Sequence, residues 1–575
     1  MEFLKGMDIS FLPEMLDRGG KFLDQHGSQR NDVFDLLKEN GVNSIRLRIW
    51  NEPENVPQSK GYCNLDHTIK MAKKIKAYGM SFFLDFHYSD WWADPSKQEK
   101  PKAWKDLSFE ELKVAVYEYT RDVLLTLEEE NVYPDMVQIG NEIRSGMLFP
   151  EGEVPNYKEL VALINAGIQG VRAADGERHQ TKIVIHLDQG GRYFYLKDWF
   201  DQAFAAGLLD FDIIGVSYYP FWHGTFTEFK DTLVNLVERY KKPVVIAETA
   251  HAWRLTDEGF IGKQQEEIAG FLATPEDQYK VIDLVMNITA SLKEEMGIGI
   301  YYWEPVVLPF ADQGGWNSNM GVFHEDGRAL PALTCFQFDR SKFHMEKARN
   351  QVAKVYHPIR RIALRGSDIR LPETIKVLFY DGSCRELPVL WKDFDKELDG
   401  VQVIEGAISS TGQGVSIELE LVQELKKSHN FVVNGDFNEG LDTWKVHKKE
   451  EQVVLSIRPD FIEPFPAPPI QYVYIESPIN FEMDISKDIV GLEPGRYRCS
   501  VDYRGTNTTG VEVRLFTQTK ENETKEEVIH PTDEDWITYS ISDIVVTDGK
   551  LKLGLLIKSP PIFGKIKNFT LTRQD

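Results

Sequence analysis

Eight short apolar runs, spaced along the first three hundred residues, constrain what this chain can fold into. Each run is rich in β-branched and aromatic residues and is bounded by polar turns, which is typical of strands buried on both faces. Such strands occur in parallel sheets that helices cover on both sides. The runs are LKGMDIS (4–10), SIRLRIW (44–50), SFFLDFH (81–87), DMVQIGNE (135–142), KIVIHLD (182–188), FDIIGVSYY (211–219), PVVIAET (243–249) and GIGIYYWEP (297–305).

Most gaps between these runs contain a stretch with helical spacing, in which apolar residues recur at intervals of three and four. Helices between successive strands imply parallel pairing, and so many strand–helix units in about 250 to 330 residues fit a closed barrel better than an open sheet. We therefore predict the α/β fold class, with a (β/α)8 TIM barrel over residues 1–345. The helical stretches include NDVFDLLKENG (31–41), LDHTIKMAKKIKAYG (65–79), FEELKVAVYEYTRDVLLTLEEE (109–130) and QYKVIDLVMNITASLKEEMG (278–297).

Polar and aromatic side chains gather where the runs end. In a barrel of this kind the carboxyl ends of the strands surround the active site. Any one of these residues could be an ordinary cap or core residue, but a buried polar group without a partner costs about 1–3 kcal/mol, so the whole set favours a function. The set comprises Asp8, Arg46, Arg48, Asp85, His87, Tyr88, Asn141, Glu142, His186, Asp188, Tyr218, Tyr219, Glu248, His251, Trp303 and Glu304.

Six long and specific stretches carry a resemblance to a known family. They are GVNSIRLRIWNEP (41–53), FFLDFHYSDWWADPSKQEKPKAW (82–104), MVQIGNEIRSGMLFPEG (136–152), GVSYYPFWHGT (215–225), VVIAETAHAW (244–253) and YYWEPVVLP (301–309). Over about residues 3–335 the chain resembles glycoside hydrolase family 53 of clan A, the arabinogalactan endo-β-1,4-galactanases. The resemblance implies a retaining hydrolase that cuts internal β-1,4 bonds in galactan, the galactose side chains of pectin.

The resemblance to clan A implies separate roles for two glutamates, with Glu142 as the acid/base and Glu248 as the nucleophile. Asn141 is then expected to hydrogen-bond the 2-hydroxyl of the sugar. Retaining enzymes hold the two carboxyl groups about 5–5.5 Å apart. Because the acid must keep its proton near neutral pH while the nucleophile is ionised, the surroundings of the two glutamates must differ.

Arginine is expected to supply part of that difference. Arg46 and Arg48 stand two apart in a strand and so share one face of the pleat, which should bring one of them near Glu248 and favour its charged form. Which of the two does so is left open, and an outward ion pair is the alternative for the other. Tyr218 is expected to hydrogen-bond the nucleophile, and His87 to line the position of the reacting sugar.

Tryptophans gather near the strand ends and in the loops that follow. Sugars stack on such rings, although a core position is the commoner explanation for any one of them. Trp303 is the strongest candidate platform, because clan A enzymes carry a tryptophan at the end of strand eight. The remaining substrate-binding candidates are Asp85, Asp90, Trp92 and His251.

Two other function classes remain open. Another clan A endo-glycosidase, acting on β-1,3-galactan, xylan or mannan, would share both glutamates and Asn141, and the segment 87–104 is what favours a galactanase. A non-catalytic carbohydrate binder on the same scaffold is expected to have lost one carboxylate, whereas this chain has both.

Beyond about residue 340 the helical spacing ends, and short alternating strands with turn signals begin. Residues 346–426, with GSDIRLPETIKVLFYDGSCRELPVLW and VIEGAISSTGQGVSIELEL, resemble a bacterial Ig-like β-sandwich, expected to act as a spacer, with a second binding module as the alternative. Residues 427–575, which open with NFVVNGDFNEGLDTWKV (430–446), resemble a jelly-roll carbohydrate-binding module, and attachment to a galactanase suggests family 61. The candidate sugar-stacking residues there are Trp444, Tyr472, Tyr474 and Trp536, of which at least two are expected to be core.

Charge and composition exclude several partners. With 66 basic and 90 acidic residues the formal net charge is −24, which argues against nucleic acid and an anionic membrane surface and suits neutral β-1,4-galactan and its oligosaccharides. The four cysteines lie far apart without metal-ligand spacing and are expected to be free thiols. We expect no cofactor or metal for catalysis, since the segment 254–270 lacks the oxygen ligands of a calcium site, and we leave open a structural calcium in the C-terminal module.

The expected location is extracellular, because a polysaccharide cannot cross a membrane. The first apolar run begins almost at once and leaves no signal segment in this sequence, so we expect that a signal was removed or that export takes another route. A cytoplasmic enzyme acting on imported oligosaccharides is the alternative.

Overall fold

The computed structural model describes residues 2–176, 180–257, 259, 261–310, 315–356, 361–366, 369, 371–423, 429–432, 434–437, 441, 444–459, 471–477, 479–519, 523–532 and 535–574. The chain separates into two compact units. One comprises Met1–Lys354 together with Leu378–Cys384, and the other comprises Val355–Val377 with Arg385–Asp575.

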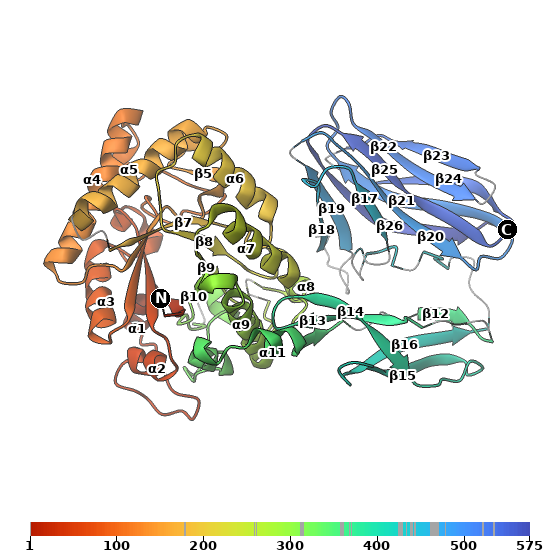
Figure 1. Cartoon of the computed structure of the whole chain (residues 1–575), viewed down its shortest axis with the longest axis horizontal. Coiled ribbons are helices and arrows are strands. Elements are labelled where there is room, and N and C mark those ends of the chain that lie inside the picture. The colour runs from red at the N-terminus through yellow and green to blue at the C-terminus, as the bar shows by residue number, and fades with distance from the viewer. Residues whose placement is uncertain are drawn as a thin grey trace. The chain divides into compact units, whose positions relative to one another are not determined.

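The first unit is a closed barrel of eight parallel strands, and the predicted fold class is confirmed (Figure 1). Around the barrel the strands follow the order β1-β10-β9-β8-β7-β4-β3-β2. All eight predicted runs contain one of them. They are β1 (Leu4–Asp8), β2 (Ser44–Ile49), β3 (Ser81–Phe86), β4 (Met136–Ile139), β7 (Lys182–Leu187), β8 (Ile213–Ser217), β9 (Val244–Thr249) and β10 (Gly297–Trp303), while β5 (Gly146–Met147) and β6 (Gly152–Glu153) form a separate small ribbon.

Helices lie around the outside of the barrel strands (Figure 1). Their ends follow local chemistry: α4 begins with a capping box, in which Ser108 accepts from the backbone of Glu111 and Glu111 accepts from that of Ser108. The helices are α1 (Leu12–Asp17), α2 (Val33–Glu39), α3 (Leu65–Ala77), α4 (Phe109–Glu129), α5 (Tyr157–Asp175), α6 (Tyr193–Ala205), α7 (Phe226–Tyr240), α8 (Lys263–Ala269), α9 (Pro275–Ala290), α10 (Trp316–Asn319) and α11 (Met345–Asn350).

The interior of the barrel changes from apolar to polar along the strands. One layer is closed by a cluster of apolar side chains that includes Phe83, Val184, Val245 and Tyr301. Gly6 makes room for the ring of Tyr301, since a Cβ there would lie 2.2 Å from Cδ1 of the tyrosine. Residues further along the same strands are charged or polar, so the polar layer lies directly above this packed apolar layer.

Beyond the barrel the chain forms the sheets expected of the C-terminal region, and their strands pair mostly antiparallel, although β12 (Arg361–Leu364) pairs parallel with β16 (Gly414–Val422). One six-stranded sheet has the order β11-β13-β14-β15-β16-β12, and a buried cluster including Ile404, Ile417 and Leu419 packs on it. Its strands are β11 (Val352–Val355), β12 (Arg361–Leu364), β13 (Thr374–Phe379), β14 (Cys384–Trp391), β15 (Gly400–Ile408) and β16 (Gly414–Val422).

The last part of the chain folds as two five-stranded sheets that enclose a common apolar core. One sheet consists of β17 (Lys445–Lys448), β20 (Phe481–Val490), β25 (Lys550–Ser559), β22 (Glu512–Thr519) and β23 (Thr524–Ile529). The other consists of β18 (Val454–Pro459), β19 (Gln471–Ser477), β26 (Ile562–Arg573), β21 (Gly495–Gly505) and β24 (Ile537–Val546). This arrangement is the sandwich that the sequence predicts.

The tip of the β13–β14 hairpin is built into the barrel unit. Lys230 on α7 forms an ion pair with Asp381 at 3.1 Å, and Thr227 donates to the carbonyl oxygen of Gly382 at 3.0 Å. Gly382 has a left-handed backbone (φ 79°), and a Cβ there would lie 2.9 Å from the side chain of Ile288 on α9. Glycine at this position therefore allows both the tight turn and the close approach of the turn to α9.

All four cysteines are free, as predicted. Among the described helices, none has the length and apolar character needed to cross a lipid bilayer.

Candidate active site

Two glutamates lie at the carboxyl ends of β4 and β9, two barrel strands that are separated by β7 and β8. Glu142 follows β4 with a left-handed backbone (φ 47°, ψ 48°). Such a backbone at a residue other than glycine costs about 1–3 kcal/mol and is concentrated at functional sites. Glu248 lies within β9 and is 5% exposed. Each glutamate influences the ionisation of Tyr219, so the two carboxyl groups face a common space.

A bulge in β9 turns Glu248 toward the mouth of the barrel. Val245 packs in the apolar layer inside the barrel, so strict alternation would direct Ala247 inward and Glu248 outward. The pairing of β9 with both β8 and β10 shifts by one residue just before or at Glu248. The extra residue reverses the alternation, which is how bulges re-aim side chains next to active sites.

Arg46 connects the surroundings of the two glutamates. Its guanidinium donates to Glu248 Oε1 at 3.0 Å and to Oδ1 of Asn141, the neighbour of Glu142, at 3.0 Å. Burial opposes its charge, but the nearby carboxylates raise its pKa above the ordinary value. The other acceptors of Arg46 are Asp8 Oδ2 at 2.9 Å, Asp85 Oδ2 at 2.8 Å and Gln138 Oε1 at 3.1 Å.

The two glutamates differ in what surrounds them. Burial, followed by the charges of Glu248 and Asp188, raises the pKa of Glu142 well above its usual range. Burial also raises the pKa of Glu248, to about 7, but the Arg46 guanidinium and the Tyr219 hydroxyl act in the opposite direction. The surroundings of Glu248 therefore favour its ionised form more than those of Glu142 do.

Tyr219, not Tyr218, supplies the phenol that contacts Glu248. Its hydroxyl donates to Glu248 Oε2 at 3.0 Å. The prediction of this contact for Tyr218 is wrong, because Tyr218 points outward, stacks on Phe229 of α7 at 3.8 Å between ring centroids and donates to the carbonyl oxygen of Gly224.

Both arginines of β2 face the barrel interior, so the alternative of an outward ion pair, which was left open for one of the two, is wrong. Arg48 donates to Glu304 at the end of β10 and lies 3.8 Å from Asp8 Oδ1. Burial raises the pKa of Glu304 to about 8, although Arg48 acts against this. The guanidinium also lies 4.3 Å from the ring centroid of Trp92.

Asp85, His87 and Asn141 are held in fixed orientations. His87 Nε2 lies 3.1 Å from Asp85 Oδ2, and its Nδ1 accepts from the backbone N–H of Ala93 at 3.1 Å, so the ring is held from both sides. Asn141 Oδ1 accepts from Arg46, and its Nδ2 donates to the carbonyl oxygen of Ala93 at 2.9 Å. The amide orientation is thereby fixed.

Two predicted binding residues are engaged elsewhere. Asp90 accepts from the backbone N–H groups of Glu52 and Lys102, at 3.0 and 2.9 Å, and so braces two loops. His251 is fully buried, and its Nε2 donates to the carbonyl oxygen of Leu272 at 3.0 Å. We therefore correct the expectation that His251 contacts substrate, because no part of it reaches the surface.

Aromatic side chains form a continuous row past Glu248. Ring centroids lie 5.8 Å apart for Trp92 and Trp303, 4.5 Å for Trp303 and Trp316, and 5.7 Å for Trp316 and Tyr219. Trp222, which is 42% exposed, continues the row at 5.5 Å from Tyr219. Half-buried and exposed rings in a line are suited to stacking on the faces of successive sugars.

Sequence reasoning gave no role to Gln138 and Ser217. Gln138 donates to Asp85 Oδ1 at 2.6 Å and to Asn141 Oδ1 at 3.2 Å. Ser217 Oγ lies 2.9 Å from Nε2 of His186. A single polar residue inside the apolar run MVQI is the signal that could have identified Gln138, since an amide buried inside a barrel needs partners.

The candidates in the last sandwich lie in different places. Trp444 is 5% exposed and donates to the carbonyl oxygen of Asn434, so it is a core residue and not a sugar platform. Tyr472 and Trp536 pack edge to face at 5.8 Å, and Lys567 Nζ lies 4.1 Å from the centroid of Trp536. Tyr474 is half-buried and runs parallel to Phe563.

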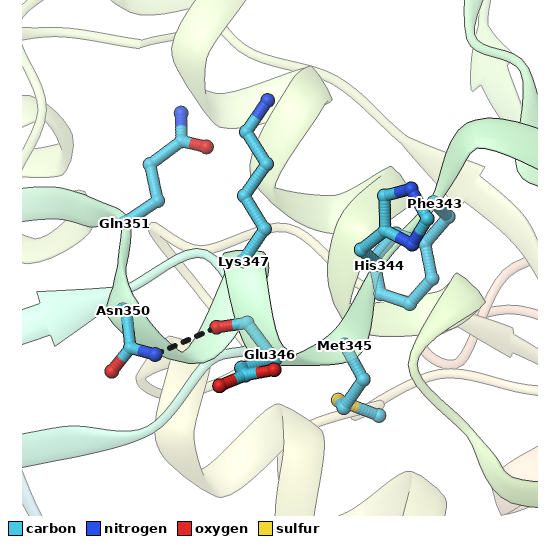
Figure 2. A pocket seen from close by; sticks show the side chains of 7 residues that line it. All are labelled: Phe343, His344, Met345, Glu346, Lys347, Asn350 and Gln351. Carbon is cyan, nitrogen blue, oxygen red and sulfur yellow. Dashed lines mark hydrogen bonds between the residues drawn. The ribbon is translucent and has the colours of Figure 1, made fainter.

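A separate depression, of about 920 Å³, lies at α11 (Figure 2), and its lining consists of Phe343, His344, Met345, Glu346, Lys347, Asn350 and Gln351. In Figure 2, Lys347 and Gln351 extend to one side of the helix and Met345 to the other, so these side chains do not converge on a ligand. Within the described part of the chain, no three His, Cys, Asp or Glu side chains are grouped so that they could hold a metal ion.

Comparison with known proteins agrees with this geometry. An uncharacterised protein of Niallia circulans is 40% identical over 353 residues, which cover 58% of this chain and 93% of the relative. A probable arabinogalactan endo-beta-1,4-galactanase A of Aspergillus tubingensis is 36% identical over 341 residues, covering 58% and 94%. The solved GH53 catalytic domain of Ignisphaera aggregans superposes with a TM-score of 0.55 at 39% identity, covering 58% and 96%. The model of glycosyl hydrolase family 53 matches residues 4–336, more than half of the chain, and the chain therefore belongs to that family.

Proposed function

We propose that this chain is an endo-hydrolase that cuts β-1,4-galactosidic bonds in galactan or type I arabinogalactan with retention of configuration. Membership of family 53 and the names of relatives such as the Aspergillus tubingensis galactanase support the substrate. The differing environments of Glu142 and Glu248 are the observation that carries the mechanism, because double displacement needs one protonated and one ionised carboxyl.

In the first step the Glu248 carboxylate attacks the anomeric carbon, and Glu142 gives its proton to the leaving glycosidic oxygen. Arg46 and Tyr219, at 3.0 Å each, hold the two oxygens of Glu248 and favour its ionised form. In the second step the ionised Glu142 takes a proton from water, which attacks the same carbon and releases Glu248. The reaction needs no cofactor, since both protons move through Glu142.

Asn141 is proposed to bind the 2-hydroxyl of the reacting sugar. One hydrogen of its amide nitrogen is used by Ala93, so a second remains to donate to the sugar. Because Arg46 and Gln138 both donate to its oxygen, the amide cannot flip, and this hydrogen keeps its direction. A contact of this kind is expected to strengthen as the ring flattens toward an oxocarbenium ion.

The test is to incubate the protein with linear galactan, xylan and mannan, to size the products and to follow the anomeric configuration of the first product by NMR. We expect short oligosaccharides from galactan alone, released first as the β-anomer. Cleavage of xylan or mannan but not galactan would favour another clan A endo-glycosidase, and release of the α-anomer would refute the double displacement.

The C-terminal sandwich is proposed to bind galactan, because its sequence resembles a carbohydrate-binding module of family 61. Tyr472, Tyr474 and Trp536 remain the candidate stacking residues, and Lys565 lies 5.3 Å from the ring centroid of Tyr472. A calcium ion in this module stays a prediction. Affinity electrophoresis in gels containing galactan tests the proposal, since Trp536→Ala should reduce retardation of the chain and Trp444→Phe should not.

We propose that the enzyme acts outside the cell on pectin side chains, because its substrate is a polymer. The net charge of −24 suits a neutral polysaccharide. Localisation of the chain in fractions of the producing cells tests this, and recovery in the cytoplasm would favour imported oligosaccharides as substrates.

A further inference from the structure

A small cavity of about 240 Å³ lies beside the mouth of the barrel, between the loops that follow β1, β2 and β3 and helix α10. We call it the side pocket. Its apolar wall is formed by Phe11, Trp50, Trp91 and Trp92, and its rim includes Glu14 and Lys60. None of these residues has a part in the two catalytic steps.

The composition of the side pocket suits a sugar ring. Trp91 and Trp92 are half-buried and pack on the buried ring of Trp50, at 4.5 and 5.2 Å between centroids, so two partly exposed indoles line one small space. At the rim, Lys60 Nζ and Glu14 Oε1 form an ion pair at 2.7 Å. Aromatic faces stack on the C–H face of a sugar, and a paired cation and anion offer both donors and acceptors to hydroxyl groups without selecting a charged ligand.

The wall of the side pocket is held in place from behind. The Arg48 guanidinium lies 4.5 Å from the ring centroid of Phe11, 5.1 Å from that of Trp50 and 4.3 Å from that of Trp92. Glu304 accepts from this guanidinium and fixes it to the end of β10. A site whose side chains are already fixed loses less entropy when a ligand binds.

The side pocket shares Trp92 with the aromatic row beside Glu248. Trp92 belongs to its wall and also begins the aromatic row that passes Trp303 and Trp316 to Tyr219, which holds the nucleophile. A polysaccharide that lies along this row therefore reaches the side pocket at Trp92, which is the end of the row away from Tyr219 and Glu248.

We infer that the side pocket binds one neutral sugar ring of the substrate at a distance from the bond that is cut. Its volume is below the about 300–1,000 Å³ of pockets that enclose drug-sized ligands, so it holds one ring and not a segment of chain. The ring belongs either to the main chain of galactan or to a side branch. This inference rests on the proposed function, because it takes the substrate to be a polysaccharide.

The experiment compares Lys60→Ala and Trp91→Ala with the wild-type full-length chain on linear galactan, on its short oligosaccharides and on branched galactan. We expect KM for the substrates that reach the side pocket to rise about fivefold to tenfold, with kcat unchanged, because one stacked ring or hydrogen-bonded contact is lost away from the reacting atoms. Lys60→Ala keeps the test valid if Trp91→Ala does not fold.

Two matched controls lie away from the mouth. Lys73, whose side chain is 54% exposed compared with 55% for Lys60, pairs with Glu130 at 2.6 Å, and Lys73→Ala should leave all constants unchanged. Phe204 on α6 is 37% exposed and packs on Tyr240, and Phe204→Ala is the control for loss of a surface aromatic.

A KM increase that appears on long linear chains and vanishes on the shortest oligosaccharides assigns the side pocket to a main-chain ring. An increase confined to branched galactan assigns it to a branch. The inference is overturned if KM is unchanged on every substrate, or if KM rises as much on the shortest oligosaccharides as on the long substrates. In either case the proposed function still stands, provided that the wild type cleaves galactan. If the wild type cleaves xylan or mannan instead, the proposed function fails and the same comparison is made on that polymer. Cleavage of none of the three overturns both.

Discussion

Replacing Tyr219 by phenylalanine removes one hydrogen bond from the nucleophile and little else. The hydroxyl donates to Glu248 Oε2 at 3.0 Å in a buried site, and it acts to lower the pKa of that carboxyl. Because a donor to the ionised form favours ionisation, its loss raises the pKa of Glu248. The acid limb of the activity profile, where Glu248 loses its proton, should therefore move to higher pH.

The size of the change follows from the strength of the bond. A hydrogen bond to a charged group contributes about 1.5–3 kcal/mol, and about 1.36 kcal/mol corresponds to one pH unit. Tyr219→Phe should move the acid limb up by about one to two pH units and lower kcat/KM on that limb by about 10-fold to 150-fold. The loss should shrink as the pH rises past the new pKa, where Glu248 is ionised in both proteins.

Tyr218→Phe is a matched control, because the same hydroxyl is removed one residue away. That hydroxyl donates to the carbonyl oxygen of Gly224 at 3.0 Å. The assay is kcat/KM for galactan across pH 4 to 9, roughly the range over which such carboxyl groups titrate, since this profile reports the free enzyme. An equal displacement of the limb in both variants, or none in Tyr219→Phe, would refute the reasoning.

Further predictions concern the other charged groups. Glu248→Ala should abolish turnover and leave galactan binding intact in affinity gels, and surviving activity would remove Glu248 from its role. The Tm of Glu142→Gln should rise relative to that of the wild type as the pH increases from 5 to 8. The folded protein raises the pKa of Glu142, so above the unfolded value of 4.5 the carboxyl ionises more easily in the unfolded chain, and the wild type loses stability that the variant keeps. A difference in Tm that stays constant with pH would contradict this. Arg46→Met should lower the free energy of unfolding by about 3–5 kcal/mol in urea titrations, because it leaves several buried carboxylates without their cation, and a loss below about 1 kcal/mol would be inconsistent with that network. Asp381→Ala should lower the Tm of the barrel unit by removing the ion pair with Lys230, whereas an unchanged Tm would mean that the hairpin tip adds no stability.

The barrel could be predicted from the sequence because apolar residues form continuous runs in its strands but recur at intervals of three and four in its helices. The eight runs were visible as apolar segments, and each contains one strand of the barrel. The roles of Glu142 and Glu248 came from family resemblance, because no periodicity distinguishes an acid from a nucleophile. Their unequal environments depend on Arg46 and Tyr219, which lie on other strands and approach only in the folded barrel.

The choice between Tyr218 and Tyr219 could have been made from alternation. Ser217, the last residue of β8, contacts His186 inside the barrel, so alternation continued past the strand directs Tyr218 outward, where it packs on Phe229 of α7, and Tyr219 inward. The direction of Glu248 could not have been obtained in this way. It depends on a bulge in β9, and nothing in PVVIAET marks where the extra residue falls.

The catalytic barrel is not one contiguous stretch of the sequence. Residues Leu378–Cys384 form the turn between β13 and β14, and they pack on the barrel through Asp381 and Gly382. A recombinant catalytic fragment that stops at the last barrel helix would therefore leave a socket on α7 and α9 exposed to water. Gene fusions that exchange the accessory modules of such enzymes would need to carry this seven-residue turn along with the barrel, or to supply another that fits it.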